Sequence, residues 1–475
     1  MEQSVQTPMG TAPVGKLMRS MGLPIILSMM IQALYNIVDS AFVSNMTGGE
    51  AALNALTLAF PVQMLMVAVS IGTGVGVNVL VAKNLGQGDS EKAAQAAGNG
   101  LFLGLVLTLI FLLFGLTGVR PYAASQTANP EILALAVTYL RICCVASFGI
   151  ILFGIFEKLL QATGLAKYST IAQITGAVTN LVLDPIMIYG LLGCPALGIT
   201  GAALATVLGQ VASFALALLF HLTANKLVKS GLAYVRPRGR IIRGIYRIGL
   251  PAILAQALMS LMTYGINRIL VGVSEAMVTA YGLYYKLQQF VLFAAFGLRD
   301  AITPIVSFAH GMHSRSRITQ GMKYGIGCTL TIMAVGMAVL LLFARPLWGL
   351  FGLSGATQAL CVSAARVISL SFLIAGFNVA LQGIFQAMDC GGSSLILSVC
   401  RQLLFVLPVA WGLARLVSPD LSNAWVVWLT FPIAEGLTAA IAGGLLVRLY
   451  RTTIRPMQPR AGNPADSPPE NVRKT

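Results

Sequence analysis

The chain has 475 residues, of which 57% are hydrophobic and only 10% are charged. Its mean hydropathy of +0.81 lies far above that of a soluble globular domain and argues strongly against a water-soluble enzyme. Lys and Arg outnumber Asp and Glu by 31 to 15, which in a membrane protein marks cytoplasmic loops rather than a nucleic-acid partner. We therefore expect a protein that crosses the lipid bilayer many times and binds no nucleic acid.

Apolar stretches of membrane-spanning length follow one another along the chain. Because a spanning helix needs about 20 apolar residues, these stretches predict an all-α fold, a polytopic membrane protein with twelve transmembrane helices in two six-helix lobes. The predicted helices cover residues 20–44, 53–82, 93–119, 132–157, 167–191, 197–224, 244–272, 277–309, 319–344, 358–386, 393–417 and 421–449.

The loop cations give a direction to this topology. Nearly all Lys and Arg of the predicted loops fall on one face of the membrane, whereas the other face holds only Arg120, Arg345 and Arg415. Loops rich in Lys and Arg stay on the cytoplasmic side of a membrane. We therefore expect both termini in the cytoplasm and the protein in the cytoplasmic (inner) membrane of a bacterium.

The two halves of the chain resemble each other. They align at an offset of 225, so that Gln161-Ala162 matches Gln386-Ala387, and an even number of helices per half makes the repeats parallel. The tail is rich in Pro and polar residues, which predicts disorder. The predicted segments are a cytoplasmic N-terminal segment (1–19), an N-terminal lobe (20–224), a basic cytoplasmic linker (225–246), a C-terminal lobe (247–450) and a disordered cytoplasmic tail (451–475).

Ionisable groups inside spanning helices are costly and therefore point to function. In the first helix, Tyr35 and Asn36 stand four and three residues before Asp39, which places a phenol, an amide and a carboxyl group on one helical face. In the fifth helix, Asn180 stands four residues before Asp184. Both helices therefore carry a polar face in an apolar surrounding, which indicates a functional role, with polar contacts between packed helices as the alternative.

Pro185 directly follows Asp184. Proline has no backbone N–H and crowds the preceding turn, so a bend next to an ionisable group is expected and Pro185 is a candidate hinge.

The second half contributes aromatic residues and cations. Aromatic faces and soft thioethers tolerate flat organic cations of varied shape, which makes a substrate cavity from Met64, Tyr281, Tyr284, Phe290 and Phe293 a hypothesis beside ordinary packing. The roles of Arg268, Lys286, Arg299 and Glu435 stay open, with pairing of a cation with Glu435 or Asp300 as the simplest interpretation.

These motifs together resemble the multidrug and toxic compound extrusion (MATE) family, in its DinF/MepA-like branch, over about residues 15–450. The resemblance implies a V-shaped pair of six-helix lobes and export of lipophilic cations against inward flow of H⁺ or Na⁺. It also implies that Tyr35, Asp39, Asn180, Asp184 and Thr206 form the ion site of the N-terminal lobe. The motifs are Pro24, Tyr35-Asn36-Ile37-Val38-Asp39-Ser40, Gly86-Gln87-Gly88, Asn180 with Asp184-Pro185, and Gly201-Ala202-Ala203-Leu204-Ala205-Thr206.

One position departs from a related branch. The NorM-like branch has a Glu where this chain has Met259, so a cation site in the C-terminal lobe is not implied.

The predicted function is secondary antiport of lipophilic cationic drugs by alternating access, by a monomer. No cofactor is expected, and no metal beyond Na⁺ at Asp39 and Asp184; H⁺ is the other candidate coupling ion. A membrane-embedded enzyme would need a nucleophile with a base or a metal cluster, neither of which the sequence suggests. A lipid-linked precursor flippase of the same superfamily and an ion channel remain alternatives.

Overall fold

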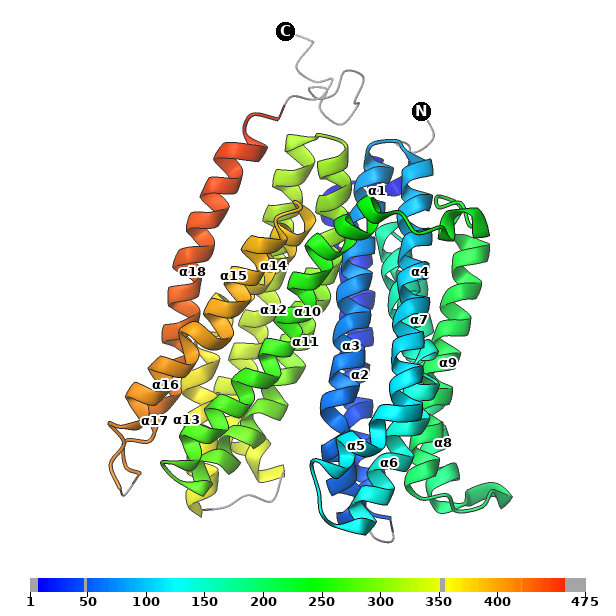
Figure 1. Cartoon of the computed structure of the whole chain (residues 1–475). Helices are drawn as coiled ribbons and strands as arrows, with labels where there is room; N and C mark the ends of the chain where they lie inside the picture. Colours follow the sequence, from blue (N-terminus) through cyan, green and yellow to red (C-terminus); the bar gives the residue numbers. More distant parts are fainter. Residues whose placement is uncertain (1–6, 47–48, 351–354, 420, 458–475) are drawn as a thin grey trace. The chain divides into compact units, whose positions relative to one another are not determined.

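A computed structural model of the chain describes residues 7–46, 49–350, 355–419 and 421–457 (Figure 1). Within these ranges every regular element is helical and no strand occurs. Ten helices are long and apolar enough to cross a membrane, and two bent helix pairs raise the number to twelve if each pair counts as one span. The predicted all-α, multi-pass fold is therefore confirmed.

Two compact units make up the chain. Unit 1 comprises Met1–Met9 and Leu27–Ile253, and unit 2 comprises Gly10–Ile26 and Leu254–Thr475. Three helices contribute residues to both units, namely α1 (Pro8–Thr11), α2 (Val14–Ser44) and α10 (Gly239–Val271).

Each of the two long shared helices carries a proline next to the unit boundary. Pro24 in α2 and Pro251 in α10 both stand two residues before the last residue on their side of the boundary. Proline removes one backbone hydrogen bond from a helix, so both boundaries fall where the helix is locally weakened. Whether the two units are the predicted functional lobes stays a prediction.

Unit 1 is a bundle of spanning helices around an apolar core. Its core includes buried residues of α3, α6, α7 and α9, and α7 packs against both α3 and α9 (Figure 1). The remaining elements of unit 1 are α3 (Gly49–Gly86), α4 (Ser90–Leu113), η1 (Phe114–Gly118), α5 (Val119–Ala124), α6 (Pro130–Val145), α7 (Phe148–Ala162), α8 (Ala166–Tyr189), η2 (Leu191–Gly193), α9 (Ile199–Ala224) and η3 (Leu232–Val235).

Helices α8 and α9 approach each other at two glycines. A Cβ atom at Gly176 would lie 2.5 Å from the carbonyl oxygen of Gly209, and one at Gly209 would lie 2.7 Å from the carbonyl oxygen of Gly176. Only glycine fits such a backbone approach, as in other tightly packed membrane helices. The contact holds together the two helices that carry Asn180 and Thr206.

The basic linker folds back onto α4. The Tyr234 hydroxyl donates to Glu91 Oε2 at 2.9 Å, and the Arg238 backbone N–H donates to Asn99 Oδ1 at 2.7 Å. The pKa of Tyr234 is raised, chiefly because its hydroxyl proton is held by the Glu91 carboxylate. The linker is therefore fixed to unit 1 by specific contacts while its cations remain exposed.

Unit 2 is built on a similar plan. Its core surrounds Trp428, Phe372 and the tyrosines of α11, and α11 packs against α12 and α14. The bent pair α13 and α14 has an angle of 52°, and the bent pair α6 and α7 in unit 1 has one of 45°. The elements are α11 (Glu275–Gly311), α12 (Arg315–Leu350), α13 (Gly355–Ser369), α14 (Phe372–Ala387), α15 (Gly391–Val399), η4 (Cys400–Leu404), α16 (Val406–Ala414), α17 (Trp425–Trp428), α18 (Thr430–Leu449) and η5 (Tyr450–Ile454).

Some boundaries differ from those expected. Helix α2 begins at Val14, within the predicted N-terminal segment. At the other end, the last span continues through the π-helical turn η5 to Ile454, where the composition had predicted disorder from residue 451. Residues 458–475 of the predicted tail lie outside the described residues.

Candidate ion site

The structure brings Asp39 of α2 and Asp184 of α8 together. Their carboxyl groups lie within hydrogen-bonding reach of each other. Asp184 is fully buried, and Asn180 one turn earlier donates to Asp184 Oδ1 at 3.3 Å. Within the described part of the chain, no Lys, Arg or His forms an ion pair with either carboxyl group. Two acids without a counter-ion therefore share one place inside a bundle of apolar helices.

Tyr35 and Thr206 lie next to this acid pair. Tyr35 lies close enough to both carboxyl groups to interact with them electrostatically, and its hydroxyl hydrogen-bonds with Gln32. Thr206 of α9 lies, with Tyr35 and Asn180, along one cavity of about 80 Å³ in unit 1. The side chain of Asn36, which was also predicted to belong to the site, lies outside the described ones.

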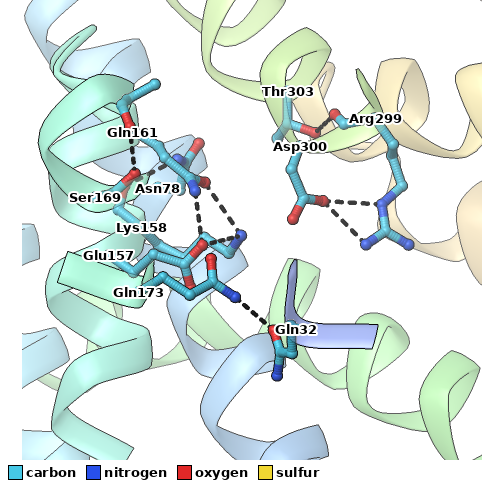
Figure 2. A network of polar contacts seen from close by, with 11 residues as sticks. Gln32, Asn78, Glu157, Lys158, Gln161, Ser169, Gln173, Arg299, Asp300 and Thr303 are labelled. Atoms are coloured by element: carbon cyan, nitrogen blue, oxygen red, sulfur yellow. Dashed lines mark hydrogen bonds and ion pairs between the residues drawn. The ribbon is translucent and has the colours of Figure 1, made fainter. Parts of the chain in front are cut away.

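Several polar side chains of α2, α8 and α9 border the cavity. Gln173 of α8 donates to Gln32 of α2, and both residues border the cavity (Figure 2). Gln210 and Ser213 of α9 complete its polar wall. A volume of this size accommodates a few water molecules. Asn180, which donates to Asp184, borders the cavity and connects it to the acid pair.

Several oxygens at the site have no hydrogen-bond partner. They are Asp39 Oδ1, Asp184 Oδ2 and Asn180 Oδ1, all of them buried acceptors. Buried acceptors are normally satisfied by a donor, a water molecule or a cation. The donor set of carboxylate and amide oxygens fits a hard cation such as Na⁺, and equally a proton on one carboxyl group.

Two further residues, Tyr139 and Gln63, lie near the acid pair or contact its neighbours and were not predicted from the sequence. Tyr139 of α6 interacts with Asp39 and hydrogen-bonds with Thr206, and it accepts a hydrogen bond of 3.0 Å from Gln63 of α3. The available signal was Gln63 itself, because an amide in the middle of an apolar span needs a partner.

Pro185 lies inside α8, which continues to Tyr189. The proline is thus one residue from the buried carboxyl group, where the missing N–H leaves the helix one hydrogen bond short.

The predicted substrate-cavity residues belong to both units, and a cavity formed by them stays a prediction. Tyr281 and Tyr284 of α11 are buried, and Tyr281 stacks on Phe431 with ring centroids 5.8 Å apart. Of the five residues, Tyr281 borders the pocket of unit 2 that is described below, whereas Tyr284, Phe290 and Phe293 do not. Met64 is a half-buried residue of α3 in unit 1.

Two buried acids of unit 2 are paired with arginines. Arg299 Nη2 lies 2.9 Å from Asp300 Oδ1 (Figure 2), and Arg401 Nε donates to Glu435 Oε1. Arg268 and Lys286 are exposed. The structure therefore contains the pairing of cations with Asp300 and Glu435 that was the simplest interpretation of the sequence.

Glu157 is a buried acid of unit 1 that has a cation beside it. Glu157 accepts from Gln161 Nε2 at 2.7 Å and lies 3.4 Å from Lys158 Nζ (Figure 2). Asn78 of α3 donates to the Lys158 carbonyl oxygen at 2.9 Å. Since Glu157 has its own cation, it differs from Asp39 and Asp184.

A bundle of apolar spans that encloses two acids without a counter-ion among the described residues is typical of a class, the helical membrane transporters, in which such acids mark ion pathways. Comparison with known proteins then gives the family. The family model MatE matches residues 24–186 and 251–411, which is more than half of the chain. The chain belongs to the MatE family, and the resemblance read from the motifs is confirmed.

Relatives and solved structures agree with this assignment. The multidrug export protein MepA of Staphylococcus saprophyticus is 25% identical over 443 residues, covering 92% of this chain and 94% of the relative. MepA of Staphylococcus aureus MRSA252 is 26% identical over 93% of this chain and 95% of its own. An outward-facing multidrug resistance MATE family transporter of the MOP superfamily superposes with a TM-score of 0.88 at 26% identity, covering 96% of this chain and 99% of the other. A MATE structure in the straight conformation gives the same values.

Proposed function

We propose that the protein is a secondary active antiporter that exports lipophilic organic cations in exchange for H⁺ or Na⁺ by alternating access. The observation that carries this proposal is the acid pair: fully buried Asp184 and half-buried Asp39 lie within hydrogen-bonding reach of each other, with no cation partner in the described part of the chain. Membership of the MatE family and the naming of the MepA relatives as multidrug export proteins support an export role.

The coupling chemistry follows from the pair. Two neighbouring carboxylates in an apolar surrounding repel each other when both are ionised, so a proton or a Na⁺ ion between them is stabilised. In the Na⁺ case Asn180 Oδ1 and the hydroxyl of Thr206 are suitable further ligands. Either ion removes net negative charge from unit 1.

Neutralisation of the acid pair by H⁺ or Na⁺ is linked to substrate release through a conformational change. An organic cation is bound more strongly while the acids are ionised, and the bound H⁺ or Na⁺ cancels that attraction. If the two charge states favour different bends of α8 at Pro185, ion entry and drug exit exclude each other, which is the condition for antiport. Pro185 thus acts as the hinge between the ion site and the rest of α8.

A flippase for lipid-linked precursors is less well supported. Such a protein needs a strongly cationic cavity for a pyrophosphate group, but Arg299 and Arg401 of unit 2 are each compensated by a carboxylate. The acid pair of unit 1 also repels an anionic substrate.

The test of this function is dye transport in proteoliposomes. Purified protein is reconstituted, and efflux of ethidium is followed under a pH gradient and under a Na⁺ gradient imposed separately. We expect one of the two gradients to drive efflux, and that gradient identifies the coupling ion. Absence of gradient-driven transport of several organic cations by correctly inserted protein would contradict the proposal.

The proposed location is the bacterial cytoplasmic membrane with both termini in the cytoplasm, and the transporting unit is a monomer. Single cysteines at positions 232 and 345, in a background without native cysteines, test the orientation with an impermeant thiol reagent. In intact cells we expect labelling at 345 and none at 232. The reverse pattern would overturn the orientation.

A further inference from the structure

Unit 2 contains a pocket whose polar end is an ion pair. The pocket lies among α10, α11, η4, α16 and α18. Its apolar walls include Met259, Met262, Phe296 and Phe431, and its polar end includes Arg401 and Glu435. None of these residues takes part in the proposed ion site of unit 1.

The arginine is presented by an irregular turn. Arg401 lies in η4, a π-helical segment in the middle of the span from Gly391 to Ala414, where the Phe405 N–H donates to the Cys400 carbonyl oxygen at 3.0 Å. Such π-bulges inside spanning helices are rare and recur at functional sites, because the extra residue turns a side chain toward a place that a regular helix does not reach.

Glu435 holds Arg401 by one edge of the guanidinium. Arg401 Nε donates to Glu435 Oε1, while Asn378 of α14 donates to Glu435 Oε2 at 2.7 Å and to the Glu435 carbonyl oxygen at 3.1 Å. The carboxylate is therefore fixed by two helices. Both side chains are largely buried, with 15% of Arg401 and 10% of Glu435 exposed.

Arg401 borders the pocket and bonds to Glu435 through its Nε atom. Within the described part of the chain, Arg401 has Glu435 as its hydrogen-bond partner and no other residue accepts from its two terminal nitrogens. A planar guanidinium binds a carboxylate through two parallel N–H donors, and this fork is left open here. The polar wall also includes the Gln402 side chain, whose Oε1 has no partner.

We propose that Arg401 makes this pocket a binding site for the carboxylate of an aromatic ligand, and thereby determines which substrates unit 2 accepts. This inference rests on the proposed export function and adds a specificity to it. The enclosed volume of about 40 Å³ accommodates an acid group rather than a ring system. The ring then lies toward Met259, Met262 and Phe296, whose thioether and aromatic surfaces accept flat groups.

A compensated arginine suits this role better than a free one. Burying a guanidinium without a counter-ion would cost folding free energy, and such a group would bind any anion too tightly. Glu435 neutralises the charge of the empty pocket and weakly repels a second carboxylate. The pair therefore admits a ligand acid with moderate strength. A ligand with a positive group as well is favoured, because that group compensates the second carboxylate.

The experiment compares two dyes that differ in one group. One is a rhodamine with a free carboxylate, and the other is its methyl ester, which has the same ring system and cationic nitrogen but no anion. Binding to purified full-length protein in detergent is measured by fluorescence anisotropy for the wild type, Arg401→Gln, Glu435→Gln and the double variant Arg401→Gln/Glu435→Gln.

The two single variants have opposite expected effects. Arg401→Gln weakens binding of the acid dye by about tenfold or more, the range expected for a lost charge-assisted pair, and changes binding of the ester by less than about twofold. Glu435→Gln strengthens binding of the acid dye relative to the ester. The double variant replaces the ion pair with two uncharged side chains and is expected to bind both dyes with similar affinity. Because it leaves no unpaired buried charge, it controls for misfolding of either single variant.

The proposal is overturned if the wild type binds the acid dye no better than Arg401→Gln does, or if both dyes change equally in each variant. Transport distinguishes this from failure of the export function. If the ester is exported under a gradient while Arg401→Gln shows no selective loss of the acid dye, the specificity is wrong and the antiporter proposal stands.

Discussion

The acid pair of unit 1 differs from the two buried acids of unit 2 that lie beside arginines. Among the described residues, Asp39 and Asp184 of unit 1 lie close together without a cation partner, and one oxygen of each has no hydrogen-bond partner, whereas Glu157 of the same unit has Lys158 beside it. In unit 2, Glu435 and Asp300 each have an arginine beside them. The comparison teaches where an ion site is to be proposed: a compensated acid has no need of H⁺ or Na⁺, so the proposed site is the pair of acids that has no counter-ion among the described residues.

The largest effect is expected from removing the charge of the unpaired acids. Asp184→Asn and Asp39→Asn each keep the size of the side chain but cannot exchange an ion, so gradient-driven ethidium efflux is expected to fall by about a hundredfold or more, as expected for loss of an essential intramembrane acid. Efflux is measured in proteoliposomes of equal protein content. The matched control is Asp89→Asn, which changes an acid outside the spans and is expected to transport normally; loss of transport there too would remove the argument for the pair.

Breaking the compensated pair is expected to cost stability. Arg401→Ala leaves Glu435 buried without its cation, which destabilises a protein by about 3–5 kcal/mol, whereas a double replacement by apolar residues, Arg401→Met with Glu435→Leu, is expected to restore most of it. Thermal unfolding in detergent measures the stability of the single and the double variant. A single variant as stable as the double variant would show that Glu435 does not depend on Arg401.

Helix spacing in unit 1 gives a smaller effect. Gly176→Leu places carbon atoms where the Gly209 carbonyl and Ser213 now lie, so α8 and α9 must separate, at a cost of about 1–3 kcal/mol. Because Asn180 and Thr206 lie on these two helices, ion affinity is expected to fall together with stability. Gly412→Leu is the control, since nothing lies within 4 Å of a Cβ atom there. Equal effects at both positions would rule out the close approach as the cause.

The smallest effect concerns an acid outside the membrane. Asp89 caps α4, where its Oδ1 accepts from the Lys92 N–H at 2.9 Å, and the pKa of Asp89 is lowered from 3.8 mainly by Lys92. Asp89→Ala is expected to cost about 1 kcal/mol, and Asp89→Asn less, since asparagine also caps helices.

The pH dependence of this cap has a defined sign. A lowered pKa in the folded state means that the contribution is present above the unfolded value of 3.8 and is lost as the pH falls through the folded value. The stability difference between wild type and Asp89→Asn is therefore expected to be constant around neutral pH and to vanish in strong acid. Because the side chain is exposed, the effect is small. A difference that grows on acidification would contradict this.

Much of the architecture could be predicted from the sequence. Span length and apolar composition fix the helices because the bilayer allows few alternatives. The position of Asn180 one turn before Asp184 is a property of a single helix, and the structure has the hydrogen bond that this spacing favours. The proximity of Asp39 to Asp184, on helices far apart in the chain, followed from the resemblance to a family and not from spacing.

The rest depended on tertiary packing. The sequence contains several cations in the second half, and nothing in their spacing selects Arg401 as the partner of Glu435 or Arg299 as that of Asp300. The π-helical turn at Cys400–Leu404 breaks the regular period on which such an argument would depend. Tyr139 and Gln63 were missed because each lies alone in an apolar stretch, and only the packing of α3 against α6 brings them to Asp39.

The central claim is that the unpaired acids of unit 1 couple ion flow to export and that the paired Glu435 of unit 2 does not. It is tested most directly by dye-driven countertransport of H⁺ or Na⁺ in proteoliposomes, measured for Asp184→Asn and for the double variant Arg401→Gln/Glu435→Gln with the methyl ester dye. We predict that ion flux is abolished in Asp184→Asn and stays near the wild-type rate in the double variant. Ion flux that survives in Asp184→Asn, or that is lost in a well-folded double variant, would contradict the claim.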